Sequence, residues 1–158
     1  MATANDRKVT PFLMFNDQLD EAIAFYLSVF PSAKVIGDAQ RGPDGKIMSA
    51  TFEVEGQVFM AYNGGPHFKF SEAFSFFVSC KDQQEVDRLW TAFTSGGGEE
   101  SMCGWLKDKF GISWQIIPTV LMELLSDPDP ERAQRATQAM LRMQKIDIAE
   151  LQRAADGN

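Results

Sequence analysis

The sequence is poor in the residues that hold metal ions or cross-link small domains. Among its 158 residues there are two cysteines, Cys80 and Cys103, and one histidine, His67. Two cysteines without a CxxC spacing favour neither a disulfide framework nor a zinc site. We expect both to pack as small apolar residues. A reactive thiol at Cys103 is disfavoured because no histidine lies near it in the sequence.

Positive charge and long hydrophobic runs are also scarce. The chain has 15 Lys and Arg against 22 Asp and Glu, for a net charge of -7, which repels phosphate backbones and anionic membrane surfaces. No stretch approaches the ~20 uncharged residues of a membrane span, and the first residues have no apolar core of signal-peptide length. We therefore expect a cytoplasmic protein that binds neither nucleic acid nor membrane.

Apolar and aromatic residues are plentiful. Hydrophobic residues make up 44% of the chain, with 13 Phe, 3 Trp and 8 Met. This composition excludes a disordered protein, and the length is enough for a core that needs no disulfide to fold.

The first part of the chain predicts the element order βαβββ. An apolar run at 10–15 predicts a strand, which Pro11 confines to a sheet edge or to the strand's first residues. Asn16 and Asp17 predict the N-cap of a helix that Pro31 ends. Further strands are expected at 34–39, 47–54 and 57–62, the last two joined by a tight hairpin at 55–56.

The same order starts again after a linker rich in glycine and proline at 63–71. A strand is expected at 74–80, and Asp82 with Glu85 predicts a capping box. A turn closed by Gly111 then predicts a hairpin at the end of the repeat. The two helices present apolar residues at one spacing: Leu19, Ala22, Ile23 and Tyr26 recur at a constant offset as Val86, Leu89, Trp90 and Phe93. We interpret residues 9–62 and 72–118 as two copies of one unit.

Residues 119–158 have a helical, charged pattern. Helices are expected at 120–125, from 127–131 to about Met143 with Asp127 or Asp129 as its cap, and after Asp147. The middle helix needs a partner for its apolar stripe, which we expect to cover an open sheet face or to reach a second subunit. That stripe consists of Ala133, Ala136, Met140 and Met143.

Two motifs carry a likeness to a known family. The pattern EAxxFYxxxFP begins at Glu21, and Asp-Lys-Phe-Gly-Ile-Ser-Trp at 108–114 is followed by Gln115. With the tandem βαβββ order, they resemble the vicinal oxygen chelate superfamily, which includes glyoxalase I, extradiol dioxygenases and bleomycin-binding proteins. Within it, the sequence is similar to the PhnB-like branch, often labelled 3-demethylubiquinone-9 3-methyltransferase-like. No strand is followed by a glycine loop suited to S-adenosylmethionine, so the residues lend the methyltransferase label no support.

The resemblance implies an α+β fold in which residues 1–118 form two βαβββ units whose mixed sheet curls into a cup, with a C-terminal helical extension at 119–158. It also implies a homodimer. Metal-dependent members hold an ion with four side chains on the first and last strands of the units. The matching positions here are Pro11, about Ser75, Met60 to Tyr62, and Gln115, of which only Gln115 is a plausible donor. We expect no metal and no other cofactor.

Strand alternation and the resemblance together select the candidate site. Aromatic and Met residues on strands are also typical of a core, His67 suits a solvated loop, and Gln115 could satisfy backbone at a sheet edge. The charged run 107–109 is expected to be a solvated turn. The ligand-binding candidates are Phe12, Met60, Tyr62, His67, Phe77, Trp105 and Gln115, and His67 is also the candidate catalytic residue.

Three functions compete. The leading hypothesis is a protein that binds a small, partly apolar molecule in a metal-free pocket. The alternative is a metal-independent isomerase or lyase that uses His67 as a general base or Gln115 to polarise a carbonyl. A third is a regulatory or scaffold module that acts through the helical tail.

Overall fold

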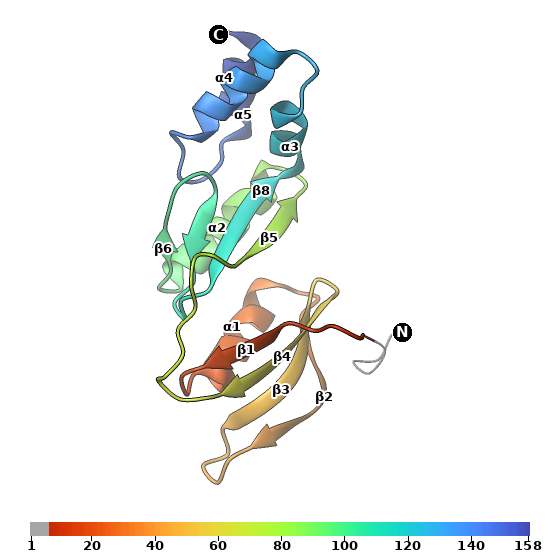
Figure 1. Ribbon diagram of the computed structural model, residues 1–158, viewed down its shortest axis with the longest axis vertical. Coiled ribbons are helices and arrows are strands. Elements are labelled where there is room, and N and C mark those ends of the chain that lie inside the picture. Colours follow the sequence, from red (N-terminus) through yellow and green to blue (C-terminus); the bar gives the residue numbers. More distant parts are fainter. Residues whose placement is uncertain (1–6) are drawn as a thin grey trace. The chain divides into compact units, whose positions relative to one another are not determined.

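The computed structural model describes residues 7–158, which form two compact units (Figure 1). The first ends at Lys69 and the second spans Phe70–Asn158. The division lies inside the expected linker, and the helical tail belongs to the second unit. The grouping of residues 1–118 as one domain, with the tail apart, stays a prediction.

The first unit is a four-stranded mixed sheet with one helix. Strand β1 lies at an edge, as Pro11 predicts, and pairs parallel with β4, whereas the other neighbours are antiparallel. The strand order is β1-β4-β3-β2. The elements are β1 (Phe12–Phe15), α1 (Leu19–Val29), β2 (Lys34–Arg41), β3 (Ile47–Val54) and β4 (Gln57–Asn63).

Helix α1 and one face of this sheet bury the first core. The predicted apolar stripe of α1 is buried, and Tyr26 stacks on Phe52 with ring centroids 6.2 Å apart. Phe52 stacks in turn on Phe59 of β4 at 5.4 Å. The aromatic column therefore fixes which sheet face meets the helix and leaves the other face open.

The predicted cap of α1 is wrong. Neither Asn16 nor Asp17 caps the helix, and Asp17 instead has a φ of 59° in the turn before it. The buried Asn63 takes the role, because its Oδ1 accepts from the Leu19 N–H at 3.0 Å while its Nδ2 donates to the Ile47 carbonyl at 3.1 Å. One side chain from the last strand thus ties α1 to the start of β3.

The second unit repeats the topology of the first. Its strand order is β5-β8-β7-β6, again with the first and last strands paired parallel at one end. Asp82 caps α2 by accepting from the Glu85 N–H at 2.9 Å, as predicted. The elements are β5 (Ser75–Cys80), α2 (Gln83–Ser95), β6 (Glu99–Glu100), β7 (Trp105–Lys107) and β8 (Ser113–Pro118). The duplicated βαβββ unit and the α+β class are confirmed.

Asp108, in the β7–β8 turn, is buried, which corrects the expectation of a solvated turn. The side chain is 3% exposed. Its Oδ1 accepts from the N–H groups of Phe110 (2.9 Å) and Ile112 (3.0 Å), and its Oδ2 accepts from Trp114 Nε1 at 2.9 Å. Lys109, by contrast, is exposed. Asp108 and Trp114, the first and last residues of the 108–114 motif, are therefore hydrogen-bonded to each other.

The tail forms helices α3 (Thr119–Leu125), α4 (Pro130–Met140) and α5 (Ile148–Asp156). Asp129 caps α4 and Asp147 caps α5. The apolar stripe of α4 packs against the tail's other helices and against one sheet residue, Ile117, rather than across an open sheet face. The buried cluster is Ile117, Leu121, Leu124, Ala136, Met143, Ile146, Leu151 and Ala155.

Backbone hydrogen bonds fasten the tail to the second unit. The N–H groups of Cys103 and Gly104 donate to the carbonyls of Met143 and Gln144, both at 2.8 Å. Gly104 has a φ of 83°, and a Cβ there would lie 2.7 Å from Ile117 Cδ1, so only glycine fits. This attachment lies directly before β7.

None of the helices in residues 7–158 has the length and apolar character needed to cross a membrane.

Candidate functional site

The open face of the first sheet carries large apolar side chains. Phe12, Met60 and Tyr62 alternate with buried neighbours and are 54%, 43% and 42% exposed. Phe12 is the register partner of Met60 on the adjoining parallel strand, and Met14 is the partner of Tyr62. Because register partners on one face are neighbours, these side chains form one continuous surface.

The corresponding face of the second sheet holds three of the candidates in one row. Phe77 of β5 is paired with Gln115 of β8, which is paired with Trp105 of β7. Phe77 is 48% exposed, whereas Gln115 and Trp105 are half-buried. These three strands are the counterparts of β1, β4 and β3, so both units place aromatic residues on the face that their helix leaves free.

Gln115 is oriented by a hydrogen bond within the sheet. Its Nε2 donates to Ser75 Oγ at 2.9 Å. The side chain thus satisfies a neighbouring side chain rather than edge backbone, and in the described residues its Oε1 accepts no hydrogen bond. A ligand that donates a hydrogen bond could use that oxygen.

Beside Trp105 lies a hollow of about 150 Å³. Lys107 pairs with Glu72 at its rim, and this hydrogen-bonded pairing lowers the pKa of Glu72 and raises the pKa of Lys107. Glu100 accepts from Trp90 Nε1 at 2.7 Å. Sequence reasoning missed this hollow, although the acidic pair at 99–100 was a visible signal. The lining residues are Glu72, Glu99, Glu100, Ser101, Trp105, Leu106, Lys107 and Ser113.

His67 lies outside both faces. It is exposed on the segment that follows β4. Of the seven candidates, the structure places three on the open face of the first sheet and three on the open face of the second, and His67 on neither.

The residues at the positions of the implied metal ligands do not fit a divalent ion. Pro11 has no donor atom in its side chain, and Ser75 and Gln115 are hydrogen-bonded to each other. Within residues 7–158, no group of three or more His, Cys, Asp or Glu side chains could hold a metal ion. Thioether, phenol, hydroxyl and amide groups are a poor donor set for zinc or iron.

The two thiols have different surroundings. Cys80 is fully buried, and this burial raises the pKa of its thiol to about 12. It therefore stays protonated and packs as an apolar residue. Cys103 is half-buried and has a φ of 60° beside Gly104.

Comparison with known proteins identifies the family. Residues 7–117 match the model of the family described as 3-demethylubiquinone-9 3-methyltransferase. The chain belongs to this family. It is also similar to a solved structure described as a putative 3-demethylubiquinone-9 3-methyltransferase, PhnB protein, from Bacillus cereus, with 31% identity, a TM-score of 0.62, and coverage of 69% of this chain and 97% of that one. No curated protein matches the sequence.

More distant structures share the fold of this PhnB-like protein. A protein from Pseudomonas aeruginosa has 21% identity, a TM-score of 0.55, and coverage of 68% of this chain and 94% of that one. The fosfomycin resistance protein FosX from Listeria monocytogenes, complexed with Mn(II) and sulfate, has 15% identity, a TM-score of 0.51, and coverage of 68% and 86%. The family match and the likeness to the Bacillus cereus PhnB protein confirm the PhnB-like resemblance, whereas these two structures show a shared fold. The family match ends just before the tail helices.

Proposed function

We propose that this PhnB-like protein binds a small, partly apolar molecule against the open faces of its two sheets, without a metal ion. The observation that carries the proposal is the continuous exposed surface of Phe12, Met60 and Tyr62, with its counterpart at Phe77. Single exposed apolar residues are common, but a group of large ones on neighbouring strands is typical of a binding surface.

Burial of these side chains supplies the affinity. Covering one large apolar side chain contributes roughly 1.5–3 kcal/mol. The polar groups beside them are few: the Tyr62 hydroxyl on one face and the Gln115 amide on the other. A ligand that is mostly apolar and has one or two hydrogen-bonding groups matches this lining.

The proposal includes the cup and the homodimer implied by the family resemblance. In it, residues 1–118 act as one domain. Each face alone is a half-covered sheet with aromatic residues toward solvent, so pairing two faces would bury both.

Binding is better supported than catalysis. His67, the candidate general base, is exposed and lies on neither face. Gln115 keeps its Oε1 as an acceptor for a hydrogen bond from the ligand, whereas its Nε2, the donor that would polarise a carbonyl, is bonded to Ser75. The donor set at the implied ligand positions supports a site without metal.

Native mass spectrometry of the purified protein, with elemental analysis, tests these points together. We expect a dimer, a copurified organic molecule and less than one tenth of an equivalent of metal. One equivalent of bound metal per chain would refute the metal-free site, and a monomer without any ligand would refute the cup.

The surface itself can be tested with the fluorescent probe 8-anilinonaphthalene-1-sulfonate. We expect Phe77→Ala to weaken probe binding about tenfold, because loss of one buried ring is worth roughly 1.5–3 kcal/mol. Phe74→Ala is the control, since Phe74 is 56% exposed but its ring packs on Phe76, on the side of the sheet where Phe76 and Trp114 meet α2. Equal affinity of both variants and the parent protein would contradict the proposed surface.

A further inference from the structure

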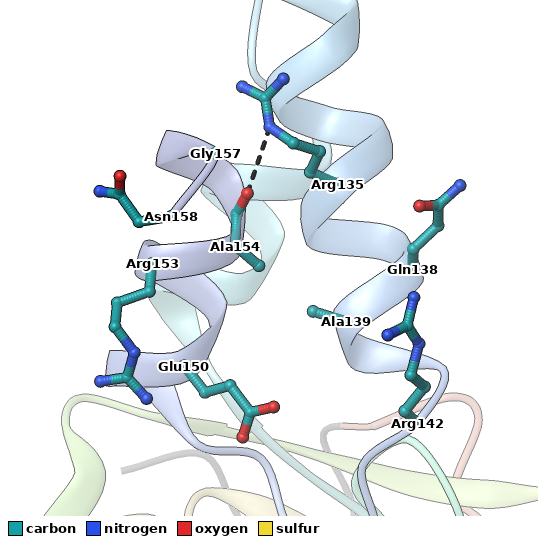
Figure 2. Close-up of a pocket in the computed structure, with 9 residues that line it drawn as sticks. All are labelled: Arg135, Gln138, Ala139, Arg142, Glu150, Arg153, Ala154, Gly157 and Asn158. Carbon is teal, nitrogen blue, oxygen red and sulfur yellow. Dashed lines mark hydrogen bonds between the residues drawn. The ribbon is translucent and has the colours of Figure 1, made fainter.

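The tail contains a hollow of its own, between α4 and α5. Figure 2 shows the residues that line it. Its volume is about 340 Å³. The lining includes three arginine side chains, of Arg135, Arg142 and Arg153, but only one acidic side chain, that of Glu150. In a chain with a net charge of -7, this is a local excess of positive charge. The other lining residues are Gln138, Ala139, Ala154, Gly157 and Asn158.

Arg135 is fixed at one side of the hollow. Its Nε donates to the Ala154 carbonyl at 3.2 Å, the bond drawn in Figure 2, and to the Ala155 carbonyl at 3.0 Å. These carbonyls are at the C-terminal end of α5, where the helix dipole is negative. The guanidinium therefore offsets the negative end of that helix.

Arg142 and Arg153 are free, unlike the neighbouring Arg132. Arg132 pairs with both Asp127 and Asp156, which uses two of the tail's carboxylates. In residues 7–158, the guanidinium groups of Arg142 and Arg153 have neither an ion pair nor a hydrogen-bond partner. Their charges are thus available to a ligand.

We infer that this hollow binds a small molecule carrying a phosphate group or a pair of carboxylates. Guanidinium groups match the geometry of these oxyanions by donating two parallel hydrogen bonds. The carboxamides of Gln138 and Asn158 add neutral donors, and the volume falls within the roughly 300–1,000 Å³ of small-molecule sites.

Glu150 sets a condition on the ligand. Its carboxylate shares the lining with the arginines and repels a bare anion (Figure 2). It can accept from a hydroxyl or amine beside the ligand's anionic group. The site therefore suits an anion that also carries such a donor. All of the lining lies after residue 117, beyond the family match, so this inference is independent of the proposed function.

Isothermal titration calorimetry of the full chain with pyrophosphate and, separately, with citrate tests the site. We expect saturable binding of at least one of them, weakened about tenfold by Arg142→Gln and by Arg153→Gln, since each removes a charge-assisted hydrogen bond. Glu150→Gln should strengthen binding severalfold by removing the repulsion. Tighter binding of pyrophosphate or of citrate shows which oxyanion the hollow prefers.

Lys46→Gln provides a matched control because it removes one positive charge from an exposed turn of the first unit. Its affinity should equal that of the parent protein. Because the two guanidinium groups have no ion-pair or hydrogen-bond partner in residues 7–158, their variants should keep the parent's circular dichroism and thermal midpoint. Absence of saturable binding of both anions, or an equal loss in Lys46→Gln, would overturn the inference.

Discussion

Asp108 shows how one side chain fixes the geometry of a hairpin that carries a site residue. Three N–H groups converge on its carboxylate, two from the turn backbone and one from Trp114. Trp114 packs against Phe93 of α2 with ring centroids 5.0 Å apart, and its neighbour in sequence is Gln115. The turn, the core and the open face are therefore linked through one carboxylate.

We expect Asp108→Ala to lower the free energy of unfolding by about 3 kcal/mol or more, because it leaves three donors without an acceptor in a buried place. Asp108→Asn should lose less, since its carbonyl still accepts from the backbone while its NH₂ group cannot accept from Trp114 Nε1. Urea denaturation measures both. Asp38→Asn, on an exposed part of β2, should change the stability by under about 0.5 kcal/mol. If Asp108→Ala also changed the stability by under about 0.5 kcal/mol, the proposed role of the carboxylate would be contradicted.

The exposed face residues were predictable, but the buried polar ones were not. Period-two alternation in β1, β4 and β8 is a local signal, so Phe12, Met60 and Gln115 could be assigned to a face from sequence. The roles of Asn63 and Asp108 depend on partners that folding brings together. Asn63 accepts from Leu19, 44 positions away, whereas Asn16 and Asp17 have the local signature of a cap and do not form one.

Among the elements, the tail is joined to the second unit through α2 and the segment before β7. Gln83, in the first turn of α2, donates through Nε2 to the Ile146 carbonyl at 2.9 Å and accepts through Oε1 from the Ile148 N–H at 2.8 Å. This single side chain bonds to the backbone on both sides of the N-cap of α5. Such bridging contacts fix the position of α5 against α2.

We expect Gln83→Ala to destabilise the protein by about 1–3 kcal/mol and to speed hydrogen exchange at the Ile148 amide, because the tail backbone loses two partners. The control is Gln84→Ala, which removes an exposed glutamine one position along the same helix. Urea denaturation and exchange mass spectrometry report the two effects. Unchanged exchange around Ile148 would show that the tail is held without this bridge.

The tail's helices were predictable from sequence, but their attachment was not. Asp129 and Asp147 are N-cap signals that the structure confirms. The stripe on α4 indicated only that an apolar partner was needed. The residues that pack against this stripe come from α3, α5 and Ile117. The backbone hydrogen bonds between residues 103–104 and 143–144 could not be predicted, because no pattern of side chains in the sequence indicates them.

For the molecule as a whole, duplication gives each unit a complete sheet. Every strand in residues 7–158 pairs within its own unit, and each unit has a helix that covers one sheet face. The repeat could be predicted because both copies keep the same helix stripe and element order. The tail adds a second core to the second unit only, so the two units differ in what stabilises them.

We expect a fragment of residues 70–158 to unfold cooperatively in urea, and a fragment of residues 70–118 to be far less stable or unfolded. The shorter fragment lacks seven of the eight members of the tail cluster, exposes Ile117, and removes the acceptors of the Cys103 and Gly104 N–H groups. Loss of several buried side chains, each worth roughly 1.5–3 kcal/mol, exceeds the stability of an ordinary small domain. Circular dichroism during urea titration measures the difference. Equal urea midpoints for the two fragments would mean that the tail helices do not stabilise the second unit. The segment before Trp105 would then keep its conformation without them.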